Sequence, residues 1–120
     1  MEIKLTEHAD EKGSYGIQVS FLDSAGDSVA PKTLAWSLVD LAGNVINSRK
    51  DVAVASPGSS EIVSLRGNDL AIITASNRQE QRILIVSGTY DDINLGADAP
   101  FYGEIRFVVD NQTNVITPSP

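Results

Sequence analysis

Apolar and polar side chains alternate with a period of two along most of the chain. In the clearest example the apolar side chains fall on odd positions and the even positions are mostly polar: Tyr15, Ile17, Val19 and Phe21 alternate with Gly16, Gln18 and Ser20. No window of helical length shows a clean stripe with a period of 3.6 residues. The pattern therefore predicts short β-strands, each with one face buried. The expected strands cover residues 2–6, 15–21, 33–40, 45–49, 52–54, 61–65, 82–90 and 101–109.

The segment Thr33–Asp40 gives the most specific local prediction, because it places Trp36 on one face together with Leu34 and Leu38. The following Leu41–Asn44 contains glycine and asparagine, which tolerate positive φ, and is typical of a hairpin connection. We therefore expect Val45–Arg49 to return antiparallel to the tryptophan strand.

The late segment Arg82–Tyr90 is apolar on both faces, as expected for a strand inside a sheet. An acidic loop over 91–100 is expected to join it to the last strand. Residues 70–76 fit either a helical turn or a strand.

Seven or eight strands at roughly ten-residue spacing predict an all-β fold, an antiparallel β-sandwich. Trp36 early in the third long strand and the doubly apolar Ile83–Val86 late in the chain match strands C and F of an immunoglobulin-like sandwich. A barrel of similar strand lengths remains an alternative. We expect one domain over residues 1–110 and a tail, 111–120, whose final residues are disordered.

Composition narrows the function classes. The 120 residues include 9 basic and 16 acidic side chains, a net charge of −7, which disfavours binding to nucleic acid. The chain has no cysteine, which excludes a disulfide framework, a thiolate metal site and a cysteine nucleophile. No apolar stretch approaches the ~20 residues that cross a bilayer. The N-terminus lacks the pattern of a signal peptide, so either the protein stays in the cytoplasm or a leader has been removed.

Few residues offer catalytic chemistry. The single histidine, His8, stands between acidic residues and is a candidate for acid–base or metal chemistry, but an exposed strand connection explains it better. No Gly-x-Ser-x-Gly motif holds a nucleophile, and the glycine spacing matches no phosphate-binding loop. We therefore expect no enzyme, and no catalytic, cofactor-binding or metal-binding residues.

Three further positions have structural and functional interpretations. Residues 91–98 form the best calcium candidate, since Asp92, Asn94 and Asp98 supply oxygen ligands, yet the spacing departs from an EF-hand loop and a solvated connection is favoured. Asp69 is expected to cap the segment that follows it. Tyr102 has the opposite parity to the other aromatic residues of its strand and is expected to face solvent.

The stretch Thr33–Leu70 carries a more specific pattern, W-S-L-x-D-x-x-G-x-V-I-N-S-R followed by G-x-D-L. It resembles small immunoglobulin-like proteins of tailed bacteriophages that are encoded among head and tail genes. The later Thr89-Tyr90-Asp91 and the aromatic last strand are also similar. The resemblance spans about two-thirds of the chain and implies a virion or assembly protein without chemistry of its own; it assigns no site residues.

The function expected on these grounds is a structural or assembly protein of a tailed phage virion. It would act through contacts with other phage structural proteins or with itself, in the virion or the host cytoplasm, with no nucleic-acid, membrane or small-molecule partner. The alternative is an immunoglobulin-like binding module for adhesion or carbohydrate, which predicts solvent-facing aromatic residues on one sheet. The sequence does not indicate the oligomeric state or a head or tail location.

Overall fold

The computed structural model describes residues 2–4, 7–74 and 76–111, with 2–4 described by their backbone alone. Over these residues the chain forms β-strands and one short 3₁₀ turn, η1 (Gly67–Leu70). The strands are β1 (Glu2–Lys4), β2 (Ala9–Asp10), β3 (Ser14–Ser20), β4 (Thr33–Val39), β5 (Val52–Ala53), β6 (Ser60–Arg66), β7 (Gln79–Asp92) and β8 (Gly96–Asp110). The all-β prediction is therefore confirmed.

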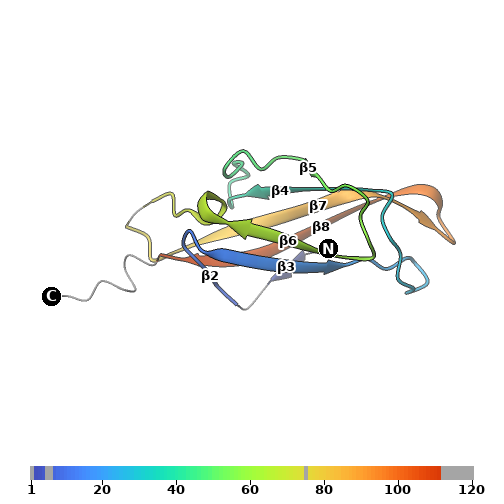
Figure 1. The fold of residues 1–120 in the computed structure, drawn as a ribbon, viewed down its shortest axis with the longest axis horizontal. Helices are drawn as coiled ribbons and strands as arrows, with labels where there is room; N and C mark the ends of the chain where they lie inside the picture. Colours follow the sequence, from blue (N-terminus) through green and yellow to red (C-terminus); the bar gives the residue numbers. More distant parts are fainter. Residues whose placement is uncertain (1, 5–6, 75, 112–120) are drawn as a thin grey trace.

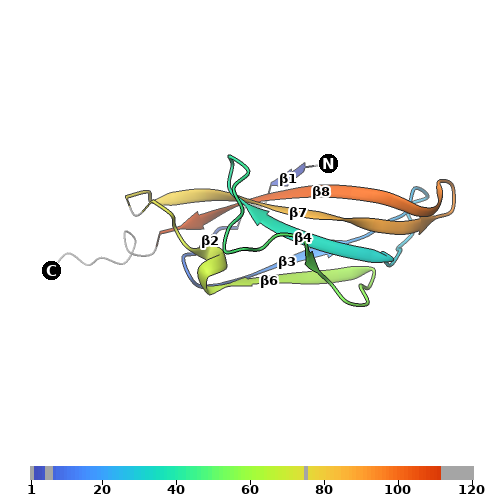
Figure 2. The ribbon, with the colours of Figure 1, turned by 90° about the horizontal axis from the view of Figure 1, so that it is seen from above.

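The strands form two sheets (Figures 1 and 2). The larger sheet has the order β1-β8-β7-β4-β5, with β2 also paired to β8, and the smaller one pairs β3 with β6. Figure 2 shows β3 and β6 as a layer beside the β8-β7-β4 layer. Trp36 of β4 pairs with Val86 of β7, so the two segments singled out in the sequence are neighbours in one sheet.

The core lies between the facing sides of the two sheets, as the period-two pattern requires. Burial of one large apolar side chain contributes about 1.5–3 kcal/mol to the stability of the folded state. Its members come from both layers: Ile17, Leu34, Trp36, Leu38, Val63, Leu65, Leu84, Val86, Ile105, Phe107 and Val109.

The molecule is elongated because β7 and β8 are long (Figure 1). They contain 14 and 15 residues, and a strand rises about 3.3 Å per residue. The Cα radius of gyration is 16.3 Å, against about 13–14 Å for a compact domain of this length. The β7–β8 turn therefore projects at one end of the molecule.

Gly88 allows β7 to approach β4 closely. A Cβ atom built at Gly88 would lie 1.9 Å from the carbonyl oxygen of Thr33. Any side chain there would force the two strands apart, so glycine is required at this position.

Three sequence predictions are corrected. Val45–Arg49 is not a strand: Val45 makes one isolated bridge, and Asn47 and Ser48 have positive φ. The loop expected over 91–100 is a short turn, because β8 begins at Gly96. The larger sheet is not antiparallel throughout, since β1 and β2 both pair parallel with β8.

The undecided segment and the first residue of the predicted tail are also placed. Leu70 ends η1, and residues 71–74 form no regular element. Asn111 is buried, and its backbone N–H donates to the carbonyl of Arg78 at 2.8 Å. The rest of the predicted tail lies outside the described residues.

Candidate interaction surface

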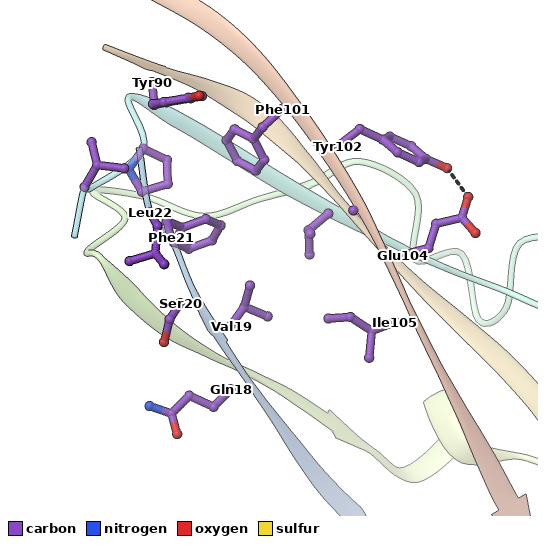
Figure 3. Close-up of a pocket in the computed structure, with 14 residues that line it drawn as sticks. Gln18, Val19, Ser20, Phe21, Leu22, Tyr90, Phe101, Tyr102, Glu104 and Ile105 are labelled. Atoms are coloured by element: carbon purple, nitrogen blue, oxygen red, sulfur yellow. Dashed lines mark hydrogen bonds between the residues drawn. The ribbon is translucent and has the colours of Figure 1, made fainter. Parts of the chain in front are cut away.

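A groove of about 250 Å³ opens between the two sheets, on the side where β3 and β8 face each other (Figure 3). Its floor consists of apolar side chains that also belong to or border the core, so the groove lies directly over the core. These side chains are Val19, Phe21, Val86, Phe101 and Ile105.

Aromatic contacts lie at the end of the groove where Tyr90 is found (Figure 3). The rings of Phe21 and Phe101 have centroids 5.4 Å apart, and those of Tyr90 and Phe101 are 6.1 Å apart in an edge-to-face arrangement. Such pairs fix the rings in place. The groove is therefore preformed.

Gln18 and Ser20 of β3 line one side of the groove, and Tyr102 and Glu104 of β8 line the other. The Tyr102 side chain is 55% exposed, which confirms the sequence prediction. Its hydroxyl donates to Glu104 Oε2 at 2.7 Å, and this hydrogen bond to a carboxylate raises the pKa of Tyr102.

The β7–β8 turn presents two apolar side chains, Ile93 (78% exposed) and Leu95 (68% exposed). Asp92 holds the turn, since its carboxylate accepts hydrogen bonds from the backbone N–H groups of Ser24, Asn94 and Leu95 at 2.7–2.8 Å. These bonds, with the Ser24 N–H first among them, lower the pKa of Asp92 to about 2. The exposed apolar pair therefore sits on a fixed turn rather than a loose loop.

The calcium-candidate side chains of the 91–98 segment do not converge. Asp92 and Asn94 both contact the Ser24 hydroxyl, at 2.7 and 2.9 Å. Asp98 instead pairs with Lys32 at 2.7 Å. No group of three potential metal ligands is found in the part of the chain that the structure describes.

His8 lies on the surface against the last strand. Its Nδ1 is 3.0 Å from Asp110 Oδ1, in an exposed pair. Neither His8 nor Asp110 lines the groove. The structure thus places the only histidine in the strand-connection role that the sequence analysis favoured.

Asp69 caps η1, accepting the backbone N–H of Arg66 at 3.2 Å, and also joins two distant residues. Its Oδ1 accepts from Asn47 Nδ2 at 2.8 Å and Arg49 Nε at 2.7 Å. Burial opposes the charge of Asp69, but the bonds from Arg49 and Asn47 outweigh it and lower its pKa. The guanidinium carbon of Arg49 lies 6.0 Å from the Trp36 ring centroid. The sequence analysis did not predict this bridge, because its members lie 20 and 22 residues apart along the chain.

The end of the molecule opposite the β7–β8 turn contains a buried ion pair that the sequence analysis did not predict. Arg82 Nη2 is 2.7 Å from Glu80 Oε1, with side chains 3% and 10% exposed. Burial alone would raise the pKa of the Glu80 carboxyl, but its hydrogen bonds have the larger effect. The backbone N–H of Ile73, the guanidinium of Arg82 and further donors lower this pKa to about 2. This cluster ties Ile73, Thr74 and Asn77 to β7.

Comparison with protein-family models, curated proteins and solved structures finds no match to this chain. Within the described residues, no helix has the length and apolar character needed to span a membrane.

Proposed function

We propose that this protein is a non-enzymatic structural or assembly component that binds other proteins through the groove and the uncovered edge of β3. The observation that carries the proposal is the coincidence of the two: an apolar groove, fixed by aromatic pairs, beside a strand edge with no pairing partner in the described part of the chain. Added strands bind such edges by main-chain hydrogen bonds, and alternate side chains enter the adjacent groove.

The non-enzymatic part of the proposal is supported by the structural roles of the three carboxylates whose pKa values are lowered. Asp92, Asp69 and Glu80 each accept several hydrogen bonds from the chain itself. Their lowered pKa values reflect structural bonds that fix turns and loops, and none lines the groove.

The strand order supports an immunoglobulin-like sandwich as the finer description of the fold. In that fold strands B and E pair in one sheet and strands C, F and G in the other. The pairs β3–β6, β4–β7 and β7–β8 match this scheme, with Trp36 on the strand equivalent to C.

The setting that we propose is the virion or assembly pathway of a tailed phage. This part of the proposal is supported by the sequence pattern from Thr33 to Leu70 alone. The adhesion or carbohydrate alternative has one supporting observation, the exposed Tyr102 at the groove. Binding on a glycan array that is lost in Tyr102→Ala would favour that alternative.

Photo-crosslinking in phage particles tests the proposal. A photoreactive amino acid at Tyr102, in the groove wall, is expected to cross-link to a structural protein of the particle. The same residue at Lys50, which is exposed and lies outside the groove, serves as the control. Absence of the protein from particles and assembly intermediates, or equal yields at both positions, would refute the proposal.

A further inference from the structure

The free edge of β3 can be read from the backbone hydrogen bonds of its two ends. The Phe21 N–H donates to the Ser59 carbonyl at 2.9 Å, and the Gly67 N–H donates to the Gly13 carbonyl at 3.0 Å. The odd-numbered residues of β3 therefore direct their peptide groups toward β6. By alternation, those of Gly16, Gln18 and Ser20 point to the other side, where no described strand pairs.

The β3 edge differs from the open edges of β6 and β8 in having no charged residue and no proline, either in β3 or at Phe21 and Leu22. The open part of β8 carries Asp98 and Pro100, and β6 carries Glu61 and Arg66. Charges and prolines of this kind protect edges from pairing with other chains. The β3 edge lacks that protection.

The absence of charged residues on the β3 edge also indicates which partner fits this edge. Two copies of a chain with net charge −7 repel each other over most approaches. At the β3 edge they meet without like charges on the pairing strands. An antiparallel edge is also self-complementary, since each outward N–H faces a carbonyl of the symmetric copy.

Two exposed apolar side chains define the register. Leu22 is 60% exposed and Ile62 is 66% exposed, and a Cβ built at Gly16 would lie 3.3 Å from Ile62 Cγ2. The Ile62 side chain therefore lies beside Gly16, which has no side chain of its own. A residue placed opposite Gly16 by a second strand would meet Ile62 there.

We propose that two copies of the chain pair antiparallel through β3, about a two-fold axis at Val19, to form a continuous sheet β6-β3-β3-β6. In this register Gln18 lies opposite the partner's Ser20, and Gly16 lies opposite the partner's Leu22, which then contacts Ile62. Because Val19 lines the groove in each copy, the two grooves meet at the axis. The inference rests on the proposed function and names a second copy of the chain as the occupant of the β3 edge, which leaves the groove and Tyr102 to other proteins.

The pairing forms about eight main-chain hydrogen bonds and two apolar contacts. An interface of this size belongs to the small, transient class, so we expect a dissociation constant of roughly 1–100 μM. Sedimentation velocity from about 1 to 500 μM is the direct measurement. It should show a concentration-dependent rise from 12.8 kDa toward twice that mass.

A matched pair of proline variants tests the edge. Gln18→Pro and Ser64→Pro each remove one N–H that points out of the two-stranded sheet, from the β3 edge and from the β6 edge respectively. We expect Gln18→Pro to weaken self-association at least about 100-fold and Ser64→Pro to leave it within about twofold. Leu22→Ser should weaken it about tenfold, with circular dichroism unchanged.

Amide hydrogen exchange keeps the test independent of variants that fold poorly. In the wild-type protein the amides of Gly16, Gln18 and Ser20 should be protected at high concentration and exchange quickly at low concentration. A wild-type protein that stays monomeric at 500 μM, or a folded Gln18→Pro that still dimerises, would overturn the inference. If the monomer still cross-links a virion protein from Tyr102, the proposed function stands and only the β3–β3 pairing fails.

Discussion

Each end of the molecule contains a carboxylate that accepts several hydrogen bonds, but the two carboxylates have different structural roles. At each end a carboxylate with a pKa of about 2 accepts several hydrogen bonds from a neighbouring segment: Asp92 at the β7–β8 turn, and Glu80 at the opposite end. Glu80 also neutralises a buried arginine, whereas Asp92 holds a turn that exposes Ile93 and Leu95. The comparison shows that similar hydrogen bonding neutralises a buried charge at one end and keeps two apolar side chains exposed at the other.

The largest effect is expected at Glu80. Glu80→Ala leaves the Arg82 guanidinium buried without its counter-charge, and breaking a buried pair in this way costs about 3–5 kcal/mol. The double variant Glu80→Leu/Arg82→Met removes both charges and should recover more than half of that loss. Urea unfolding of the wild type and both variants measures the difference. A loss below about 1 kcal/mol for Glu80→Ala would contradict the stability role.

A smaller loss of global stability is expected for Asp92→Ala. This change leaves neutral backbone N–H groups without an acceptor, whereas Glu80→Ala leaves a buried charge without its partner. The melting temperature should fall less than in Glu80→Ala. Hydrogen exchange should accelerate locally at the amides of Ser24, Asn94 and Leu95, which donate to Asp92 in the wild-type protein. Asp98→Ala removes an exposed pair with Lys32 and is the control, with no local change. Equal exchange in the two variants would show that Asp92 does not fix the turn.

Both carboxylates should make the protein sensitive to acid. Their folded-state pKa values, about 2, lie below the ordinary values near 4, so their contribution is complete above about pH 5 and is lost as the pH falls toward 2. Glu80→Gln and Asp92→Asn should each flatten the fall in melting temperature between pH 5 and 2. A fall as steep as that of the wild type in both variants would show that other groups control acid unfolding.

The sequence predicted the strands well where one face is buried, and failed where the geometry depends on distant partners. Alternation placed Trp36 on a strand with a buried face, and two apolar faces placed Ile83–Val86 on a strand inside a sheet; the two segments pair within the larger sheet. The segment after Asn44 looked like a strand, but Asn47 turns to Asp69, a contact across 22 residues that periodicity does not encode.

The candidate surface was less accessible to sequence reasoning. Only Tyr102 was identified, from its parity, because exposure on a strand follows directly from alternation. The groove depends on how far β3 and β8 separate, and the open edge depends on which strands are neighbours. Neither is encoded locally. The one available signal for the edge was the absence of charge over residues 14–22.

The smallest stability effect is expected at the tip itself, and it separates display from packing most cleanly. Ile93 and Leu95 are largely exposed, so Ile93→Ser and Leu95→Ser should change the free energy of unfolding by no more than about 0.5 kcal/mol. If the tip belongs to the contact surface, the same variants should lower the cross-linking yield from Tyr102 severalfold. A loss above 1 kcal/mol in urea unfolding would instead mean that these side chains pack against the fold. Unchanged stability with unchanged cross-linking would confine the contact surface to the groove and the β3 edge.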